Sequence, residues 1–365
     1  MDGVLEVSII INNYNYERFI AEAIDSALSQ IYTNIEVIVV DDGSTDSSRD
    51  VIRSYGDRIL PLFQPNGKQG AAFNNGFAHS KGDIIIFLDA DDYLYPQAVE
   101  HIVTAWQPGI SKVHYHLDVV GAEGEPRGYA VPPAAVSLDQ GDLSQKVIEA
   151  AGYIGVSTSG NALSRAALSQ VTPIPKKYAT TSDDYLSVLI PFFGEVVAIS
   201  QSLGAYRIHD SNQWAMVEVE SKRFHRFIHH DLQRCELTQQ WGEKLNRPVP
   251  NDLYMRSFGR VWSRLSSLRL DPSNHPIPAD NRFRLTWLGL RALWKYSSFN
   301  VFKRIIFSLW FLWVGLLPAP IAKVAITWLF APHLRPKVIA RSLNTLRSWI
   351  TSPVTTHSTS SESSS

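Results

Sequence analysis

The chain has 365 residues, enough for one large domain with appendages or for two domains, and its 45% hydrophobic and 19% charged content excludes an intrinsically disordered protein. Its single cysteine, Cys235, excludes an intrachain disulfide framework and fits a reducing compartment. The formal net charge of −1 is unevenly distributed, because residues 281–348 contain eleven Lys and Arg residues and no Asp or Glu.

The first part of the chain alternates between strand and helix patterns. Apolar runs bounded by polar turn residues predict strands over 4–11, 35–40, 59–63 and 84–88. Helical periodicity predicts helices over 17–29, 44–56, 68–79 and 96–106, and Ser44 is the expected N-cap of the second. Such alternation is typical of an α/β fold, with parallel βαβ units in an open sheet and helices on both faces.

Residues 110–210 predict a mixed continuation of the sheet. KVHYHLDVV has a strand pattern, and GEVVAISQSLGAYRIH predicts a pair of strands. TTSDDYLSVLI predicts a helix that begins after its cap Ser182 and ends at Pro191. His114 and His116 share one face of a strand, but no cysteine or acidic partner lies at zinc-binding spacing, so we assign them no metal.

The last third of the chain predicts helices and an apolar block. Residues 214–270 have a helical pattern, with Arg256, Arg260 and Arg264 on one expected exposed stripe, and a proline-rich linker follows at 271–281.

Residues 305–322 are eighteen positions without a charge, but Pro318 and Pro320 interrupt them near the end. Basic residues flank the block, and six of the ten tryptophans fall within 281–349. We interpret the block as a hairpin that re-enters the membrane or lies in its plane, with both ends cytoplasmic. A single crossing and a buried core helix are the alternatives. This composition favours a membrane surface, and not nucleic acid, as the partner.

Three carboxylates, Asp89, Asp91 and Asp92, crowd the end of the predicted strand IIIFL. Asp92 alone is explained as a cap for the helix that follows. Asp89 and Asp91 would repel each other beside an apolar strand, and a bound divalent cation would remove that conflict. Because Mg²⁺ is usually held by one or two carboxylates plus substrate phosphates, the cluster predicts half of a metal site whose other half is a diphosphate.

Two neighbouring segments support a ligand site at this edge of the sheet. Asp41 and Asp42 end another parallel strand, where a carboxylate can accept from a base or a ribose hydroxyl, or cap the next helix. The segment NGKQGAAFNNGFAHSKGD combines Lys68 with glycines that would let the backbone approach a ligand.

The order and spacing of three segments resemble a known family. VSIIINNYNYERFIAEAIDSALSQ, then IEVIVVDDGSTDSS, then NGKQGAAFNNGFAHSKGDIIIFLDADDYLYP resemble the family 2 glycosyltransferases of the GT-A fold. The later pieces NALSRAAL, SDDYLSVLI and AYRIH fit as well, so the resemblance covers about residues 5–210. It implies a Rossmann-like, mostly parallel sheet and an inverting, nucleotide-sugar-dependent, hexosyltransferase-type enzyme.

The resemblance implies roles at the donor end of the site. Asp42 would hold uracil or another base, with Asn13 and Tyr14 lining the same pocket, and Asp89 would meet the ribose. Lys68 lies in the segment that leads to this cluster.

The resemblance also implies which residues bind the metal and which take part in catalysis. Asp91 would bind a Mg²⁺ or Mn²⁺ ion that bridges the diphosphate, and His209 would reach the metal or the diphosphate. Asp184 would supply the catalytic base, although the usual Glu–Asp pair is Asp183–Asp184 here, which leaves open which of the two acts. Arg207 would pair with the diphosphate or with a carboxylate.

The Gln-x-x-Arg-Trp motif of processive synthases is absent, since Asn212–Gln213–Trp214 lacks the arginine, which favours addition of one sugar. The expected reaction moves a sugar from a nucleotide diphosphate sugar, a UDP-sugar above all, to a hydroxyl of a lipid-linked or cell-surface glycan. A nucleotidyltransferase and a non-catalytic sugar-nucleotide binding protein are the alternatives.

The predicted organisation has four parts. They are a catalytic domain at 1–212, a helical extension and linker at 213–280, a membrane-associated basic region at 281–350, and a disordered serine-rich tail at 351–365. The start MDGVLEVSIII lacks the basic residues and cleavage site of a signal peptide, so we expect none. The expected location is the cytoplasmic face of the cell membrane.

Overall fold

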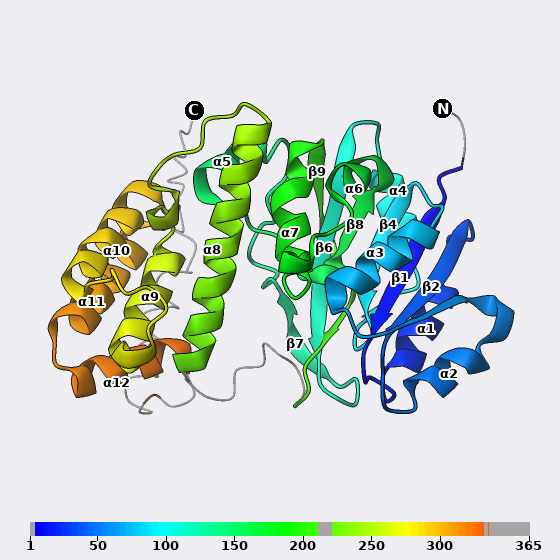
Figure 1. The fold of residues 1–365 in the computed structure, drawn as a ribbon, viewed down its shortest axis with the longest axis horizontal. Helices are drawn as coiled ribbons and strands as arrows, with labels where there is room; N and C mark the ends of the chain where they lie inside the picture. Colours follow the sequence, from blue (N-terminus) through cyan, green and yellow to red (C-terminus); the bar gives the residue numbers. More distant parts are fainter. Residues whose placement is uncertain (1–3, 211–220, 332–334, 336–365) are drawn as a thin grey trace, which may run out of the picture. The chain divides into compact units, whose positions relative to one another are not determined.

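The computed structural model describes residues 4–210, 221–331 and 335 (Figure 1). The chain divides into two compact units that do not follow chain order. The first unit comprises residues 1–215 and 226–260, and the second comprises 216–225 and 261–365. The domain boundaries expected at 212, 280 and 350 remain predictions, and the tail at 351–365 lies outside the described residues, as do Asn212–Gln213–Trp214.

The first unit is built on a sheet that has nine strands within the described residues. Its order is β3-β2-β1-β4-β8-β6-β9-β5, and β7 pairs with β6. The strands are β1 (Val7–Asn13), β2 (Ile35–Asp42), β3 (Leu60–Gln64), β4 (Ile84–Asp89), β5 (Tyr93–Leu94), β6 (Ile110–Val120), β7 (Pro126–Val131), β8 (Asn161–Ser164) and β9 (Glu195–Arg207). The pairs β1–β2, β1–β4 and β2–β3 are parallel, so the predicted parallel half is confirmed.

The register of these strands brings the acidic segments to one edge. Asn12 of β1 pairs with Asp89 of β4, and Asn13 pairs with Asp41 of β2. The carboxyl ends of β1, β2 and β4 therefore lie side by side, which is where open α/β sheets bind ligands.

The second half of the sheet is mixed, as expected, but one detail differs. β8 runs antiparallel to β4 and β6, whereas β9 runs parallel to β6. The expected pair of strands after residue 195 is wrong, because β9 is one strand of 13 residues. Its register on β6 jumps from Ile199 to Ser202, so the polar residues that resemble a turn form an irregularity within the strand.

Twelve α-helices lie within the described residues. They are α1 (Ile20–Leu28), α2 (Ser48–Ser54), α3 (Gln69–His79), α4 (Ala98–Ala105), α5 (Ser144–Ala150), α6 (Arg165–Val171), α7 (Ser182–Leu189), α8 (Ser221–Lys244), α9 (Phe258–Leu270), α10 (Arg282–Tyr296), α11 (Val301–Leu316) and α12 (Ala319–Phe330). Alternate residues of β1 serve opposite faces of the sheet. Ile9 and Ile11 join the core formed with α1, α2 and α4, whereas Ile10 joins the core formed with α3, α6 and α7.

One local expectation near the site is wrong. Ser44 does not cap α2, which begins at Ser48; its hydroxyl instead accepts hydrogen bonds from Asn13 and Asn15. Two glycines of α3, Gly70 and Gly76, are closely packed against neighbouring elements. A Cβ on Gly76 would lie 2.3 Å from Ile10 Cγ2, and one on Gly70 would lie 3.0 Å from Ala179 Cα.

The expected exposed stripe of arginines is also wrong, because Arg260 and Arg264 are buried. Arg260 donates to the carbonyl oxygens of Leu253 and Ala151. Arg264 forms an ion pair with Asp280 in the second unit. Arg260 and Arg264 lie one helical turn apart on α9, whereas Arg256 precedes that helix. The guanidinium groups of Arg260 and Arg264 satisfy buried acceptors.

The second unit is helical, and the apolar block forms a hairpin of two helices in it. α11 ends at Leu316 and α12 begins at Ala319, so the break falls at Pro318. Trp310 donates to the carbonyl oxygen of Ala325 across the hairpin at 3.0 Å. Among the described helices, none is both long enough and apolar enough to cross a membrane.

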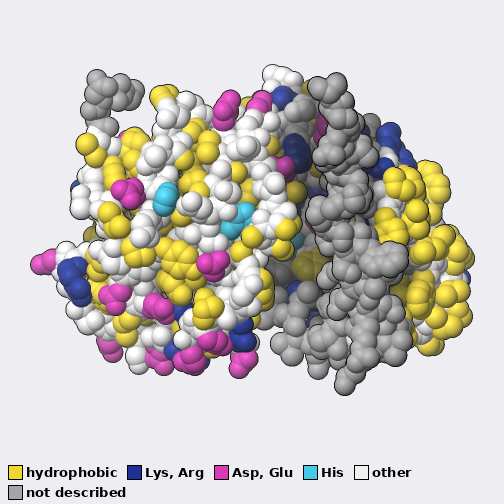
Figure 2. All heavy atoms as spheres, turned by 180° about the vertical axis from the view of Figure 1, so that it is seen from behind, with side chains coloured by type: hydrophobic (Ala, Val, Ile, Leu, Met, Phe, Trp, Pro, Cys, Tyr) yellow, Lys and Arg dark blue, Asp and Glu magenta, His cyan; other side chains and the backbone are white. Residues whose placement is uncertain are grey.

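The helices of the second unit expose many large hydrophobic side chains (Figure 2). We call this set the apolar surface: Phe283, Trp287, Trp294, Val301, Phe302, Ile305, Leu309, Leu312, Leu316, Ile321 and Val324. Trp287 is 61% exposed and Leu309 is 60% exposed. A contiguous exposed apolar area of this kind marks an interaction surface.

Candidate functional site

A cavity of about 360 Å³ lies at the carboxyl ends of β1, β2 and β4. We call it the donor cavity. Its lining includes the predicted residues Asn13, Tyr14, Asp42, Lys68, Asp89, Asp91 and Asp183. Arg207, His209 and Asp184 do not line it. The structure therefore gathers most of the expected site residues from five separate segments of the chain.

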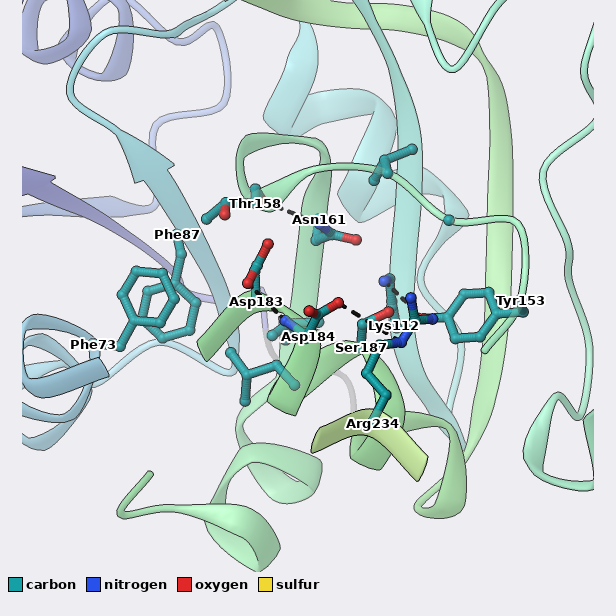
Figure 3. A pocket seen from close by; sticks show the side chains of 14 residues that line it. Phe73, Phe87, Lys112, Tyr153, Thr158, Asn161, Asp183, Asp184, Ser187 and Arg234 are labelled. Atoms are coloured by element: carbon teal, nitrogen blue, oxygen red, sulfur yellow. Dashed lines mark hydrogen bonds and ion pairs between the residues drawn. The ribbon is translucent and has the colours of Figure 1, made fainter. Parts of the chain in front are cut away.

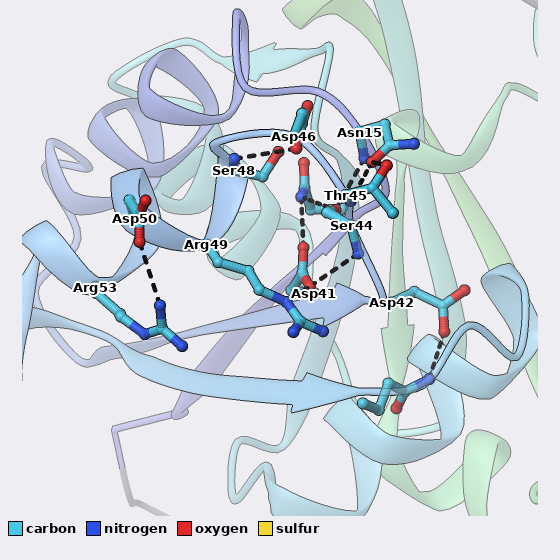
Figure 4. Close-up of polar contacts among 12 residues, drawn as sticks. Asn15, Asp41, Asp42, Ser44, Thr45, Asp46, Ser48, Arg49, Asp50 and Arg53 are labelled. Atoms are coloured by element: carbon cyan, nitrogen blue, oxygen red, sulfur yellow. Dashed lines mark hydrogen bonds and ion pairs between the residues drawn. The ribbon is translucent and has the colours of Figure 1, made fainter.

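The carboxylates at the end of β2 divide between two tasks (Figure 4). Asp41 is fully buried and accepts from Asn13, from the Ser44 amide and from Arg49 Nε at 2.7 Å. Burial alone would raise its pKa, but these hydrogen bonds lower the pKa of Asp41 below its ordinary value. Asp42 instead faces the donor cavity, where Gln64 and the Gly67 amide hold it.

The carboxylates after β4 also differ in role: one has structural partners, and two line the donor cavity. Asp92 accepts from Ser159 Oγ at 2.6 Å and from the Arg207 amide at 3.0 Å, so it joins three segments and does not cap α4, whose N-cap is Gln97. Asp89 and Asp91 line the donor cavity. Burial, with the charge of Asp91 next, raises the pKa of Asp89 to about 7.

Of the two residues expected at a metal, Asp91 lines the donor cavity and His209 lies directly behind it. His209 Nε2 lies 3.1 Å from Asp91 Oδ2. Within the described residues, no group of three or more His, Cys, Asp or Glu side chains could hold a metal by itself. Two protein ligands beside a buried like-charge cluster match a cation whose remaining ligands are diphosphate oxygens and water.

The Arg207 side chain contacts other groups of the protein and not the donor cavity. Its side chain is almost fully buried, donates to the carbonyl oxygens of Asp91 and Ala122, and forms an ion pair with Glu22. It therefore supports the loop that carries Asp91 and does not face the donor cavity.

The two carboxylates at the start of α7, Asp183 and Asp184, also have different surroundings (Figure 3). Asp184 Oδ2 lies 2.6 Å from His230 Nδ1, and its other oxygen lies 3.7 Å from Arg234 Nε. Asp183 lines the donor cavity, and its Oδ1 accepts from the Asp184 amide at 2.8 Å.

Different surroundings separate the pKa values of the pair. Burial, followed by the charge of Asp184, raises the pKa of Asp183 to about 6. Burial would also raise the pKa of Asp184, but the hydrogen bond with His230 and the charge of Arg234 lower it overall. A carboxyl that titrates near neutral pH is suited to proton transfer.

His230 and Arg234 were not identified from the sequence. Both lie on α8, about 50 residues after the acidic pair, and nothing in the local pattern of that helix links them to α7. The only signal was their four-residue spacing, which places both on one helix face.

Comparisons with known proteins indicate the family. Residues 8–144 match the model of glycosyl transferase family 2. An uncharacterized glycosyltransferase of Nostoc sp. is 37% identical over 215 residues, which cover 57% of this chain and 66% of the relative. These matches support a glycosyltransferase of family 2.

Further relatives of the family match shorter parts. An uncharacterized glycosyltransferase of Rickettsia prowazekii is 50% identical over 95 residues, which cover 26% of this chain and 30% of that protein. The matches thus span less than two thirds of these relatives' own length.

The solved structures support the fold. The crystal structure of Staphylococcus aureus TarS 1–349 in complex with UDP-GlcNAc has a TM-score of 0.51 and 14% sequence identity, and the match covers 89% of this chain and 91% of that one. The predicted GT-A fold is confirmed.

We predict that His230→Gln destabilises the protein in a pH-dependent way. Burial would lower the pKa of His230, but Asp184 raises it above 6.5, so the charged pair stabilises fully below pH 6.5 and less as the pH rises through the raised pKa. The expected loss is about 1–3 kcal/mol at pH 6 and smaller at pH 9, measured by urea unfolding. The exposed His101→Gln is the control. An equal loss at both pH values would contradict the charged pair.

Proposed function

We propose that this chain transfers one sugar from a nucleotide diphosphate sugar, a UDP-sugar, to a hydroxyl of a lipid-linked or cell-surface glycan, with inversion at the anomeric carbon. The observation that carries the proposal is the donor cavity, in which Asp42, Asp89, Asp91 and Asp183 meet. The family match supports the reaction class.

The nucleoside end of the donor fits the cavity wall between β1 and β2. Asp42 offers carboxylate oxygens to base N–H groups, and Tyr14 offers a half-exposed ring. The Lys68 ammonium lies 6.0 Å from the centre of that ring, at the N-terminus of α3. Lys68 therefore brings a positive charge to the region expected to receive the diphosphate.

Asp91 and His209 would hold a Mg²⁺ or Mn²⁺ ion. When bound, such an ion neutralises the diphosphate that leaves as the glycosidic bond breaks. Asp89 and Asn12 complete this wall, with Asn12 Nδ2 donating to Asp89 at 2.9 Å.

The geometry favours Asp183 over Asp184 as the general base. Asp183 lines the donor cavity, whereas Asp184 is engaged by His230 and Arg234. Asp183 would accept the proton of the acceptor hydroxyl as that oxygen attacks the anomeric carbon. A single carboxylate that assists one direct displacement accounts for inversion.

The apolar surface supports a location at the cytoplasmic face of a membrane that contains anionic lipids. Basic side chains occur on the same three helices: Arg282, Arg284, Arg291, Lys295, Lys303, Arg304 and Lys323. No acidic residue occurs on α10, α11 or α12. Hydrophobic insertion and electrostatic attraction together give stable peripheral binding, and a lipid-linked acceptor lies at such a surface.

We predict that Asp91→Asn lowers metal-dependent turnover about a hundredfold or more, because the ion that neutralises the leaving group loses a ligand. Release of UDP from a panel of UDP-sugars with Mn²⁺ measures this. The exposed Asp57→Asn is the control. Turnover of Asp91→Asn at the wild-type level would show that Asp91 does not bind the metal.

Asp183→Asn is expected to lower kcat about 10²–10⁴-fold while UDP binding is kept, because only the proton acceptor is lost. The wild-type kcat should fall as the pH drops through about 6, where Asp183 becomes protonated. Asp184→Asn should retain this pH profile at reduced activity. If Asp184→Asn loses all turnover and Asp183→Asn does not, the base assignment is reversed.

We expect the protein to sediment with vesicles that contain phosphatidylglycerol. Its affinity for phosphatidylcholine vesicles should be lower by about tenfold or by a larger factor. The double variant Trp287→Ser, Leu309→Ser should lose most of this binding. Tyr129→Ser, at a residue 54% exposed in the first unit, is the matched control. Equal binding to both kinds of vesicle, or unchanged binding of the double variant, would contradict the membrane surface.

A further inference from the structure

A second cavity, of about 210 Å³, lies beside the donor cavity in the first unit (Figure 3). The two cavities share Thr158 and Asp183 in their walls. Asp183 thus stands between the place expected for the nucleotide and a separate space formed by β6, β8, α7 and α8.

The second cavity contains a buried ammonium group. Lys112 lies in β6 between β8 and β9, and the residue is 2% exposed. Its Nζ donates to the Tyr153 hydroxyl at 2.9 Å and lies 5.3 Å from the centre of that ring. In the part of the chain that the structure describes, no ion pair joins Lys112 to a carboxylate. Burial of a charged ammonium with a neutral partner is costly, so the position calls for an anion.

Two other charged groups of the wall, Asp184 and Arg234, are already paired with each other. The carboxylate of Asp184 lies between His230 and Arg234, which leaves it no free charge for Lys112. Two further polar atoms of the wall have no hydrogen-bond partner among the described residues: Asn161 Oδ1 and Arg234 Nε. A buried ammonium group and an acceptor oxygen that lacks a donor, both on residues of one cavity wall, suit a ligand that carries anionic oxygen and hydroxyl groups.

We propose that the second cavity binds an anionic oxygen group, a carboxylate or a phosphate on a sugar, with Lys112 as its counter-ion. The inference rests on the proposed function, because the shared wall at Asp183 makes this group part of one of the two substrates. It belongs either to the transferred sugar, as in a uronic acid, or to the acceptor, as in a sugar phosphate. Asn161 accepts from a neighbouring hydroxyl of the same sugar.

Titration calorimetry with Mn²⁺ separates the two sources. In the donor arm, UDP-glucuronate and UDP-glucose, which differ only in the carboxylate, are each titrated into the full chain. In the acceptor arm, the chain is first saturated with UDP and Mn²⁺, so that the diphosphate site is filled, and glucose 1-phosphate is compared with glucose. Lys112→Met removes the charge and keeps most of the volume, and the exposed Lys81→Met is the matched control.

The expected result is a preference of about tenfold or more for the charged member of one pair, lost in Lys112→Met and kept in Lys81→Met. Preference for UDP-glucuronate assigns the anion to the donor, and preference for glucose 1-phosphate assigns it to the acceptor. Asn161→Asp, which adds a negative charge to the same wall, should also abolish the preference. It serves as a second variant if Lys112→Met does not fold.

The proposal is overturned if the wild-type chain prefers the charged member of neither pair, or if the preference survives in Lys112→Met and Asn161→Asp. Binding of UDP-glucose with Mn²⁺ distinguishes this failure from failure of the proposed function. If UDP-glucose binds without any charge preference, only the second cavity is wrongly assigned; if no UDP-sugar and no UDP binds, the proposed function itself is contradicted.

Discussion

Electrostatic repulsion between neighbouring carboxylates is the constraint on which the site depends. Three acidic pairs lie near one edge of the sheet, and in each pair one member is held by side chains or backbone amides of the protein and does not line the donor cavity. Arg49 and Asn13 hold Asp41, Ser159 and the Arg207 amide hold Asp92, and His230 holds Asp184. The other members, Asp42, Asp91 and Asp183, line the donor cavity. The fold thus keeps some carboxylates for its own stability and presents their neighbours to a ligand.

This division explains why the cavity is suited to a nucleotide diphosphate sugar. Carboxylates that face a cavity are stabilised by a cation or by donor groups of a ligand. In the proposed function, Asp42 accepts from base N–H groups, and Asp91 with His209 holds a cation. Asp183 accepts the proton of the acceptor hydroxyl.

Much of this could be predicted from the sequence, because parallel strands place their carboxyl ends at one edge. Apolar runs predicted strands ending at residues 11, 40 and 88, one or two residues before the observed ends at Asn13, Asp42 and Asp89. The contacts of each carboxylate were not predictable, because its partners come from distant segments of the chain. Asp184 depends on His230, 46 residues away, and Asp92 depends on Ser159. Lys112 looked like an ordinary polar residue of a strand, since period-two patterns do not show when both faces of a sheet are covered.

The central claim is that Asp91 and His209 hold a cation beside the diphosphate. Anomalous diffraction at the manganese edge, from crystals of the full chain grown with UDP and Mn²⁺, tests it most directly. The account predicts a peak within about 2.5 Å of both Asp91 and His209 side-chain atoms and in contact with the UDP diphosphate. Bound UDP with the manganese peak elsewhere, or with no peak, would contradict it.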